Sequence, residues 1–253
     1  MRRRILHSLL AALPSCIIAS SQQQETSFEA LLPAGAEIVE TVKLTATVSK
    51  PRLMVLWMLK PEHHLDNLAD KNREGGYCSD IAGGDFGKYR RGPARLSLID
   101  ARQGRIINTT GIREGYGEGR DSLLLPVCVL NWYAGAGNQM SDGFGTPNMN
   151  LRDLTGEGLK TQFVLLVFAA FGIADTGVVG YDSLSDRVVQ YPIELQSPNG
   201  AIKGFWAEQV FAREPVRPGY WKFSWQPGHG AEGSMCEDVK FDRVRRLFVQ
   251  THD

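Results

Sequence analysis

Strict alternation of apolar and polar residues marks the first clear β-strand. Between residues 41 and 48 every second position is valine, leucine or alanine, and the positions between are threonine or lysine. This period of two puts successive side chains on opposite faces of a sheet, so one face is buried and the other meets solvent. Residues 53–59 and 163–171 are instead continuously apolar, which predicts strands buried on both faces.

Three later segments share one design: a strand, a short polar turn containing an aspartate, and a second strand. They are residues 95–109, 177–195 and 236–250. Aspartate suits such turns because its carboxylate accepts hydrogen bonds from the turn's own backbone. We therefore predict three hairpins, although their spacing is too irregular to establish internal repeats.

Helical patterns are few. Residues 61–73 and 204–213 are predicted as short helices, the second with Trp206, Val210 and Phe211 on one side. The glycine-rich residues 75–92 and 133–150 are predicted as long loops. The pattern therefore predicts an all-β, mostly antiparallel fold with a few short helices. We expect an irregular β-sandwich, with a small irregular β-propeller as the alternative.

The N-terminus has the organisation of an export signal. Three arginines at positions 2–4 precede a short apolar stretch, residues 5–14, which is too short for a confident membrane span. Residues 13–16 (LPSC) resemble the lipobox of bacterial lipoproteins. The resemblance implies cleavage before Cys16, lipidation of Cys16, and an exported protein of the periplasm or cell envelope. The alternatives are plain cleavage near residues 19–21 and an N-terminal helix of the folded domain.

The length of 253 residues suits one sizeable core. We therefore expect an export signal at 1–15, a flexible tether at 16–27 and a single β-rich domain at 28–253. Export implies an oxidising compartment, in which Cys78, Cys128 and Cys236 would form one disulfide and leave one thiol. The sequence does not choose the pair, and three buried free thiols are an equal alternative.

A glycine-punctuated loop, residues 153–158 (DLTGEG), directly precedes the second continuously apolar run. It resembles the calcium loop of integrin-type FG-GAP repeats, in which oxygen ligands spaced two apart converge on the ion. The resemblance implies Asp153, Thr155 and Glu157 as calcium ligands, and calcium as the one candidate cofactor. The alternative is a plain polar turn that leads into the buried strand.

Two further groups of residues suggest binding chemistry. Trp221, Phe223 and Trp225 share one face of a strand. If that face is exposed, Trp221 and Trp225 would stack on sugar rings, as in carbohydrate-binding modules; if it is buried, they form core. The densest set of transition-metal ligands is His63, His64, Asp66 and Asp70, which would need His229 or Cys236 to complete a site. The alternative is that these side chains lie on the surface in contact with solvent and bind no metal.

Composition and motifs narrow the function. The formal net charge is zero, so there is no basic excess to neutralise phosphates and nucleic acid is excluded as a partner. The chain has no G-x-S-x-G, H-E-x-x-H or P-loop motif. We predict a non-catalytic binding or scaffolding protein of the bacterial cell envelope, with a protein or glycan partner and membrane contact only through the lipid anchor.

Two other functions stay open. One is a carbohydrate-binding module that uses the aromatic face. The other is an exported hydrolase that uses carboxylates of the glycine-rich loops as its acid and base. Whether two carboxylates can act as such a pair depends on the distance between them. These carboxylates are Asp80, Asp85, Glu114, Asp121 and Asp142.

Overall fold

The computed structural model describes residues 28–44, 50–66, 87–113, 123–125, 149–168, 174–208, 210–225 and 235–252. Within these ranges the chain forms β-strands and two short 3-10 turns, η1 (Phe28–Leu31) and η3 (Val210–Ala212). The predicted all-β class is confirmed. No helix in the same ranges has the length and apolar character needed to cross a membrane.

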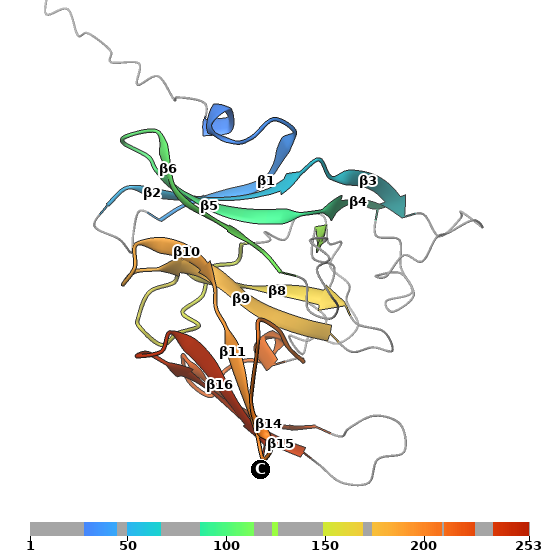
Figure 1. The fold of residues 1–253 in the computed structure, drawn as a ribbon, viewed down its shortest axis with the longest axis vertical. Helices are drawn as coiled ribbons and strands as arrows, with labels where there is room; N and C mark the ends of the chain where they lie inside the picture. Colours follow the sequence, from blue (N-terminus) through green and yellow to red (C-terminus); the bar gives the residue numbers. More distant parts are fainter. Residues whose placement is uncertain are drawn as a thin grey trace, which may run out of the picture.

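Three open sheets lie one above another, with a small sheet at the side (Figure 1). The first sheet has the antiparallel order β1 (Ala36–Lys43), β2 (Arg52–Leu59), β5 (Ala94–Asp100), β6 (Arg105–Gly111). In the second, β9 (Ala174–Asp182) pairs with β8 (Gln162–Phe168), β10 (Arg187–Gln190) and β13 (Ala207–Glu208).

The third sheet is mixed, because β11 and β16 run parallel and the other pairs are antiparallel. Its order is β12 (Gly200–Gly204), β11 (Ile193–Ser197), β16 (Leu247–His252), β15 (Met235–Asp242), β14 (Tyr220–Trp225). The small sheet has the order β3 (Glu62–Asp66), β4 (Gly87–Gly92), β7 (Leu123–Leu125). These stacked sheets agree with the sandwich prediction.

Two hydrophobic cores separate the three layers. Met54, Leu56 and Leu96 of the first sheet pack with Phe163 and Val179 of the second. On the opposite face of the second sheet, a separate core joins it to the third; its members include Val164, Val178, Trp221, Val239 and Phe248. Because the middle sheet is covered on both faces, β8 needs apolar residues at consecutive positions, as its sequence predicted.

The first sheet is also covered on both faces. Leu53, Val55 and Trp57 point away from the first core and pack under the N-terminal segment that contains Phe28 and Leu31. The side chains of β2 are therefore buried on both sides, and the predicted double burial of this strand is confirmed. Inside this layer the Trp57 indole donates to the Ser97 hydroxyl at 2.8 Å.

Both predicted helices are wrong within the described residues. In the first, residues 62–66 form β3, whose backbone hydrogen-bonding groups pair with those of β4. Residues 67–73 lie outside the described ranges. In the second, β13 and η3 replace the helix because the Thr176 hydroxyl donates to the Ala207 carbonyl and accepts from the Phe211 amide. Phe211 then enters the second core, whereas Trp206 packs against the first.

The three predicted hairpins are present, and their turns are alike. We call residues 101–104, 183–186 and 243–246 the first, second and third hairpin turns. An aspartate precedes each turn and accepts backbone hydrogen bonds from within it. The last turn residue has positive φ each time: 58° at Gly104, 52° at Asp186 and 57° at Arg246. The structural likeness is thus closer than the irregular spacing suggested.

Candidate functional site

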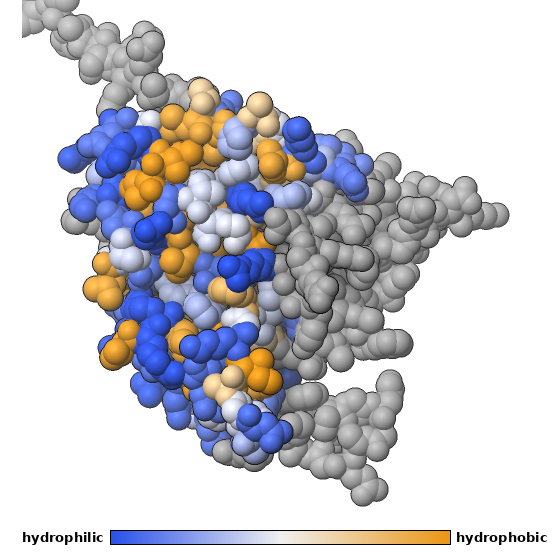
Figure 2. Space-filling model, in the orientation of Figure 1, coloured by the Kyte–Doolittle hydropathy of each residue, from blue (hydrophilic) through white to orange (hydrophobic). Residues whose placement is uncertain are grey.

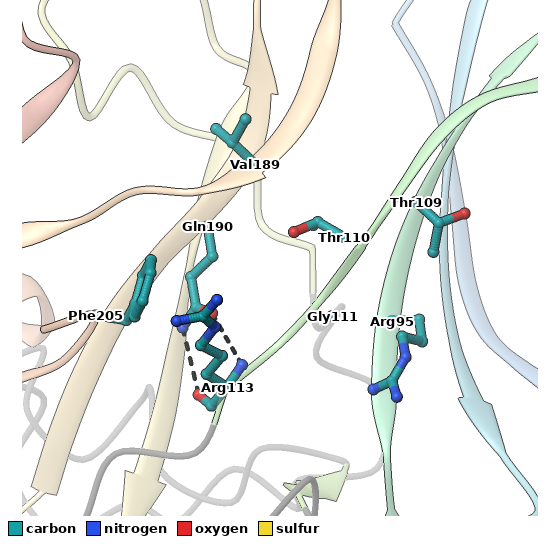
Figure 3. A pocket seen from close by; sticks show the side chains of 8 residues that line it. All are labelled: Arg95, Thr109, Thr110, Gly111, Arg113, Val189, Gln190 and Phe205. Atoms are coloured by element: carbon teal, nitrogen blue, oxygen red, sulfur yellow. Dashed lines mark hydrogen bonds between the residues drawn. The ribbon is translucent and has the colours of Figure 1, made fainter. Parts of the chain in front are cut away.

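A cleft of about 580 Å³ opens between β6 of the first sheet and β10 of the second (Figure 3). Two arginines lie in its wall, and none of the lining residues that the structure describes is acidic. The lining consists of Arg95, Thr109, Thr110, Gly111, Arg113, Val189, Gln190 and Phe205. The described lining therefore places two guanidinium groups on the wall of the cleft.

The backbone of Arg113 is held by side chains from the second sheet and its neighbourhood. Its amide donates to the Gln190 side-chain oxygen at 2.9 Å. Its carbonyl accepts from the Trp206 indole at 2.6 Å and from the Gln190 amide nitrogen at 3.4 Å. The guanidinium lies over the Phe205 ring, 4.8 Å from the centroid, a favourable cation–π geometry. Arg113 is thus positioned before any ligand arrives.

A glycine in β9 gives Phe205 and Trp206 their place. A Cβ at Gly177 would lie 2.9 Å from the Phe205 carbonyl oxygen and 3.0 Å from the Trp206 ring. A side chain at this position would force the 205–206 segment outward, together with the ring that supports Arg113. The absence of a side chain at Gly177 therefore shapes one wall of the cleft.

Arg95 reaches the cleft from β5 by lying across the edge strand. It pairs in register with Gly111 of β6, and a Cβ built at Gly111 would be 3.6 Å from the Arg95 guanidinium carbon. One guanidinium nitrogen donates to the Ala94 carbonyl at 3.0 Å. The missing side chain at Gly111 leaves the surface of β6 open for this guanidinium.

The lining groups suit binding better than catalysis. Guanidinium groups present donors that match the oxygens of carboxylates and phosphates, and Val189 and Phe205 add apolar surface. None of the described lining residues is a histidine, cysteine, aspartate or glutamate, so this wall supplies neither a general base nor an activated nucleophile.

Known proteins add nothing to this picture. No family model, curated protein or solved structure matches the chain.

The predicted calcium loop is engaged in contacts within the protein. The Asp153 carboxylate accepts from the amides of Glu157 at 3.1 Å and Gly158 at 2.8 Å. The Thr155 hydroxyl donates to Glu157 at 3.1 Å, and Glu157 forms an ion pair with Arg246. Each of the three proposed ligands therefore has a partner inside the protein.

The same loop joins the second sheet to the third. Gly156 and Gly219 have φ of 70° and 79° and let two backbones touch. A Cβ at Gly156 would lie 2.5 Å from the Pro218 carbonyl oxygen, and one at Gly219 would lie 2.8 Å from the Thr155 oxygen. Arg246 also pairs with Asp182. These contacts favour the polar-turn interpretation.

Calcium is expected to leave the melting temperature unchanged. Arg246 already neutralises Glu157, and no group of three or more His, Cys, Asp or Glu side chains within the described ranges could hold a metal ion. Thermal melts in excess calcium and in excess chelator should coincide, for the unsubstituted chain and for Asp153→Ala. A rise of several degrees with calcium that Asp153→Ala abolishes would instead establish the ion site, because a ligand bound by the folded state stabilises it.

Trp221 is buried, in agreement with the alternative in which the aromatic face forms core. Its side chain is 1% exposed and lies in the second core. Its indole donates to the Arg213 carbonyl at 3.1 Å, and its ring meets Phe211 edge-on at 5.0 Å. The second sheet covers the face that a sugar would need. Phe223 packs against the same core, and the Trp225 side chain lies outside the described part.

Of the remaining candidates, His63 and Cys236 have side chains that the structure describes. The exposed His63 ring contacts the Glu37 carboxylate at 3.0 Å, and Cys236 is a half-buried free thiol. The other predicted metal, thiol, acid and lipidation positions lie outside the described residues, as side chains or entirely: His64, Asp66, Asp70, His229, Cys78, Cys128, Asp80, Asp85, Glu114, Asp121, Asp142 and Cys16.

Proposed function

We propose that the protein is a non-catalytic binding protein of the bacterial cell envelope, and that the cleft between β6 and β10 binds an anionic group, a carboxylate or a phosphate. The observation that carries the proposal is the pair Arg95 and Arg113. Both line the cleft, three hydrogen bonds hold the Arg113 backbone, and the Arg113 guanidinium lies over the Phe205 ring.

Preorganisation is the physical reason to expect useful affinity. Binding costs the ordering of flexible side chains, about 0.5–1.5 kcal/mol for each one immobilised. The contacts that hold Arg113 form when the protein folds, so part of this ordering cost does not arise on binding. The volume of about 580 Å³ falls within the range of small-molecule sites, roughly 300–1,000 Å³.

The envelope location rests on the N-terminal signal and its lipobox resemblance. Lipidation at Cys16 would hold the protein at a membrane through several acyl chains, and residues 16–27, which are polar from position 20 onward, would act as the tether. The mass of the mature N-terminus tests this part: retention of residues 1–15 would refute it.

Replacing either arginine is expected to weaken anion binding about ten- to hundredfold, since a hydrogen bond to a charged group contributes roughly 1.5–3 kcal/mol. The probes are galacturonate and galactose, which differ only in the carboxylate, and inorganic phosphate. Calorimetric titration should show galacturonate or phosphate binding to the unsubstituted chain and no galactose binding. Arg95→Gln and Arg113→Gln should both lose that affinity.

The matched control is Arg217→Gln, which removes an equal charge at an exposed position outside the cleft and should leave binding unchanged. Equal loss in this control would mean that net charge, and not the cleft, drives binding. Galactose affinity equal to that of galacturonate, or no binding of either anion, would refute the proposed anion site.

A further inference from the structure

All three hairpin turns lie at one edge of the molecule and are linked by ion pairs. Arg52, at the start of β2, binds Asp100 before the first turn and Asp186 in the second. Arg246 in the third turn binds Asp182 before the second. Figure 1 shows the tips of β5–β6, β9–β10 and β15–β16 along the left side. We call these three turns, the strand residues on either side of each turn, and Lys50 to Arg52 the turn edge.

The turn edge exposes two large aliphatic side chains. Leu184 is 77% exposed and Val244 is 92% exposed. They occupy the same position, the second of four, in the second and third turns. In Figure 2 separate apolar residues protrude among hydrophilic ones along the left side, where Figure 1 has these turns. Neither side chain has a packing role that would explain an aliphatic residue.

Basic side chains outnumber acidic ones at the same edge, although the whole chain has a formal net charge of zero. The acids are already paired: Asp100 and Asp186 with Arg52, and Asp242 with Arg245. Four arginines of the edge have no carboxylate partner in the described part of the chain; they are Arg102, Arg105, Arg187 and Arg243. Arg102, Arg105 and Lys50 also line a cleft of about 340 Å³.

We propose that the turn edge docks on an anionic phospholipid bilayer, with Leu184 and Val244 inserted among the headgroups and the arginines bound to lipid phosphates. Aliphatic residues flanked by arginines favour the interface of an anionic membrane, because burial of apolar surface and charge attraction act together. A protein partner would instead need a contiguous apolar centre depleted of charge, and here each aliphatic side chain stands alone among charged ones.

The proposal also gives the molecule an orientation. Arg95 and Asp100 lie near opposite ends of β5, about 16–17 Å apart at the usual rise per residue. A docked turn edge therefore keeps the Arg95–Arg113 cleft away from the headgroups and open to dissolved ligands. The bilayer contact does not depend on that cleft binding anything.

The test reports which surface touches the bilayer. Leu184→Cys, Val244→Cys, Ile202→Cys and Val216→Cys of the full chain each carry a fluorophore that brightens and shifts to the blue in apolar surroundings. Ile202 and Val216 are matched controls, 63% and 64% exposed and outside the three hairpin turns. The unsubstituted chain, labelled in the same way, supplies the background of the native cysteines. Since the N-terminal residues are identical throughout, any anchoring by them cannot produce a difference between sites.

With vesicles of equal phosphatidylcholine and phosphatidylglycerol, the probes at 184 and 244 should shift, and those at 202 and 216 should not. Vesicles of phosphatidylcholine alone should give little signal. Adding Arg102→Gln, Arg105→Gln and Arg187→Gln to the Leu184→Cys chain should raise the vesicle concentration for half-maximal signal at least about tenfold, given about fivefold per charge near an anionic surface.

Three results would overturn the proposal. The first is no shift at 184 and 244, and the second is an equal shift at 202 and 216. The third is reversal of the vesicle signal by free glycerol phosphate at the same phosphate concentration, which would assign the edge to a soluble phosphate ligand. A signal undiminished in the triple-glutamine chain would remove the arginines from the mechanism.

Discussion

Alanine in place of Gly156 is expected to lower the free energy of unfolding by about 2–5 kcal/mol, the sum of left-handed backbone strain and overpacking. Gly156 has φ of 70°, and an added Cβ would lie 2.5 Å from the Pro218 carbonyl oxygen. The two backbones are close at a second point, since a Cβ at Gly219 would lie 2.8 Å from the Thr155 carbonyl oxygen. Chemical unfolding in urea measures the loss.

Gly158→Ala is the matched control. Its φ is 82°, so it carries the same backbone strain, but nothing lies within 4 Å of the added Cβ. Its cost should stay near the 1–2 kcal/mol of the left-handed conformation alone. Equal losses in the two variants would show that the loop does not press on residues 218–219, and the joint between the second and third sheets would need another explanation.

Local pattern predicted the strands and turns well, because those features depend on neighbouring residues. The consecutive apolar positions of β2 and β8 announce burial on both faces, and an aspartate leads each hairpin turn. The failures occur where a distant strand decides the outcome. Residues 62–66 form a strand because β4 pairs with them, and no periodicity within residues 61–73 reports that partner.

The cleft could not be predicted, because its residues come from separate sheets. Arg95 lies on β5, Arg113 follows β6, and Gln190 ends β10. The sequence feature that relates to the cleft is glycine at 111 and 177, because each lets another group pass close to the strand. A glycine in the sequence does not indicate which group that is. Trp221 is a second example of what the sequence cannot predict. The alternation of residues places three aromatic side chains on one face of a strand, but the packing of the sheets determines whether that face is buried.

Methionine in place of Arg52 is expected to destabilise the protein by about 3 kcal/mol, the lower end of the cost of removing one partner of a buried ion pair. The Arg52 side chain is 5% exposed. It donates to Asp186 at 2.7 Å and 3.0 Å and to Asp100 at 2.8 Å. The Asp186 side chain is 30% exposed, so water offsets part of the loss. Arg102→Met, at an exposed arginine with no carboxylate partner among the described residues, should change stability by less than about 0.5 kcal/mol.

The effect of Arg52→Met should also depend on pH. The hydrogen bonds from Arg52, with smaller contributions from Lys50 and Tyr181, hold the pKa of Asp186 well below its usual value. The stabilisation from a lowered carboxyl pKa is complete above the unfolded-state value, about 3.9, and disappears as pH falls through the folded-state value. The stability difference between the two chains, measured by urea unfolding, should therefore be constant above about pH 5 and shrink below about pH 4. A difference that persists at the lowest pH would mean that Arg52 stabilises the edge by packing and not by charge. Asp186→Asn in the Arg52→Met background separates the two, because it should restore stability only if an unpaired carboxylate causes the loss.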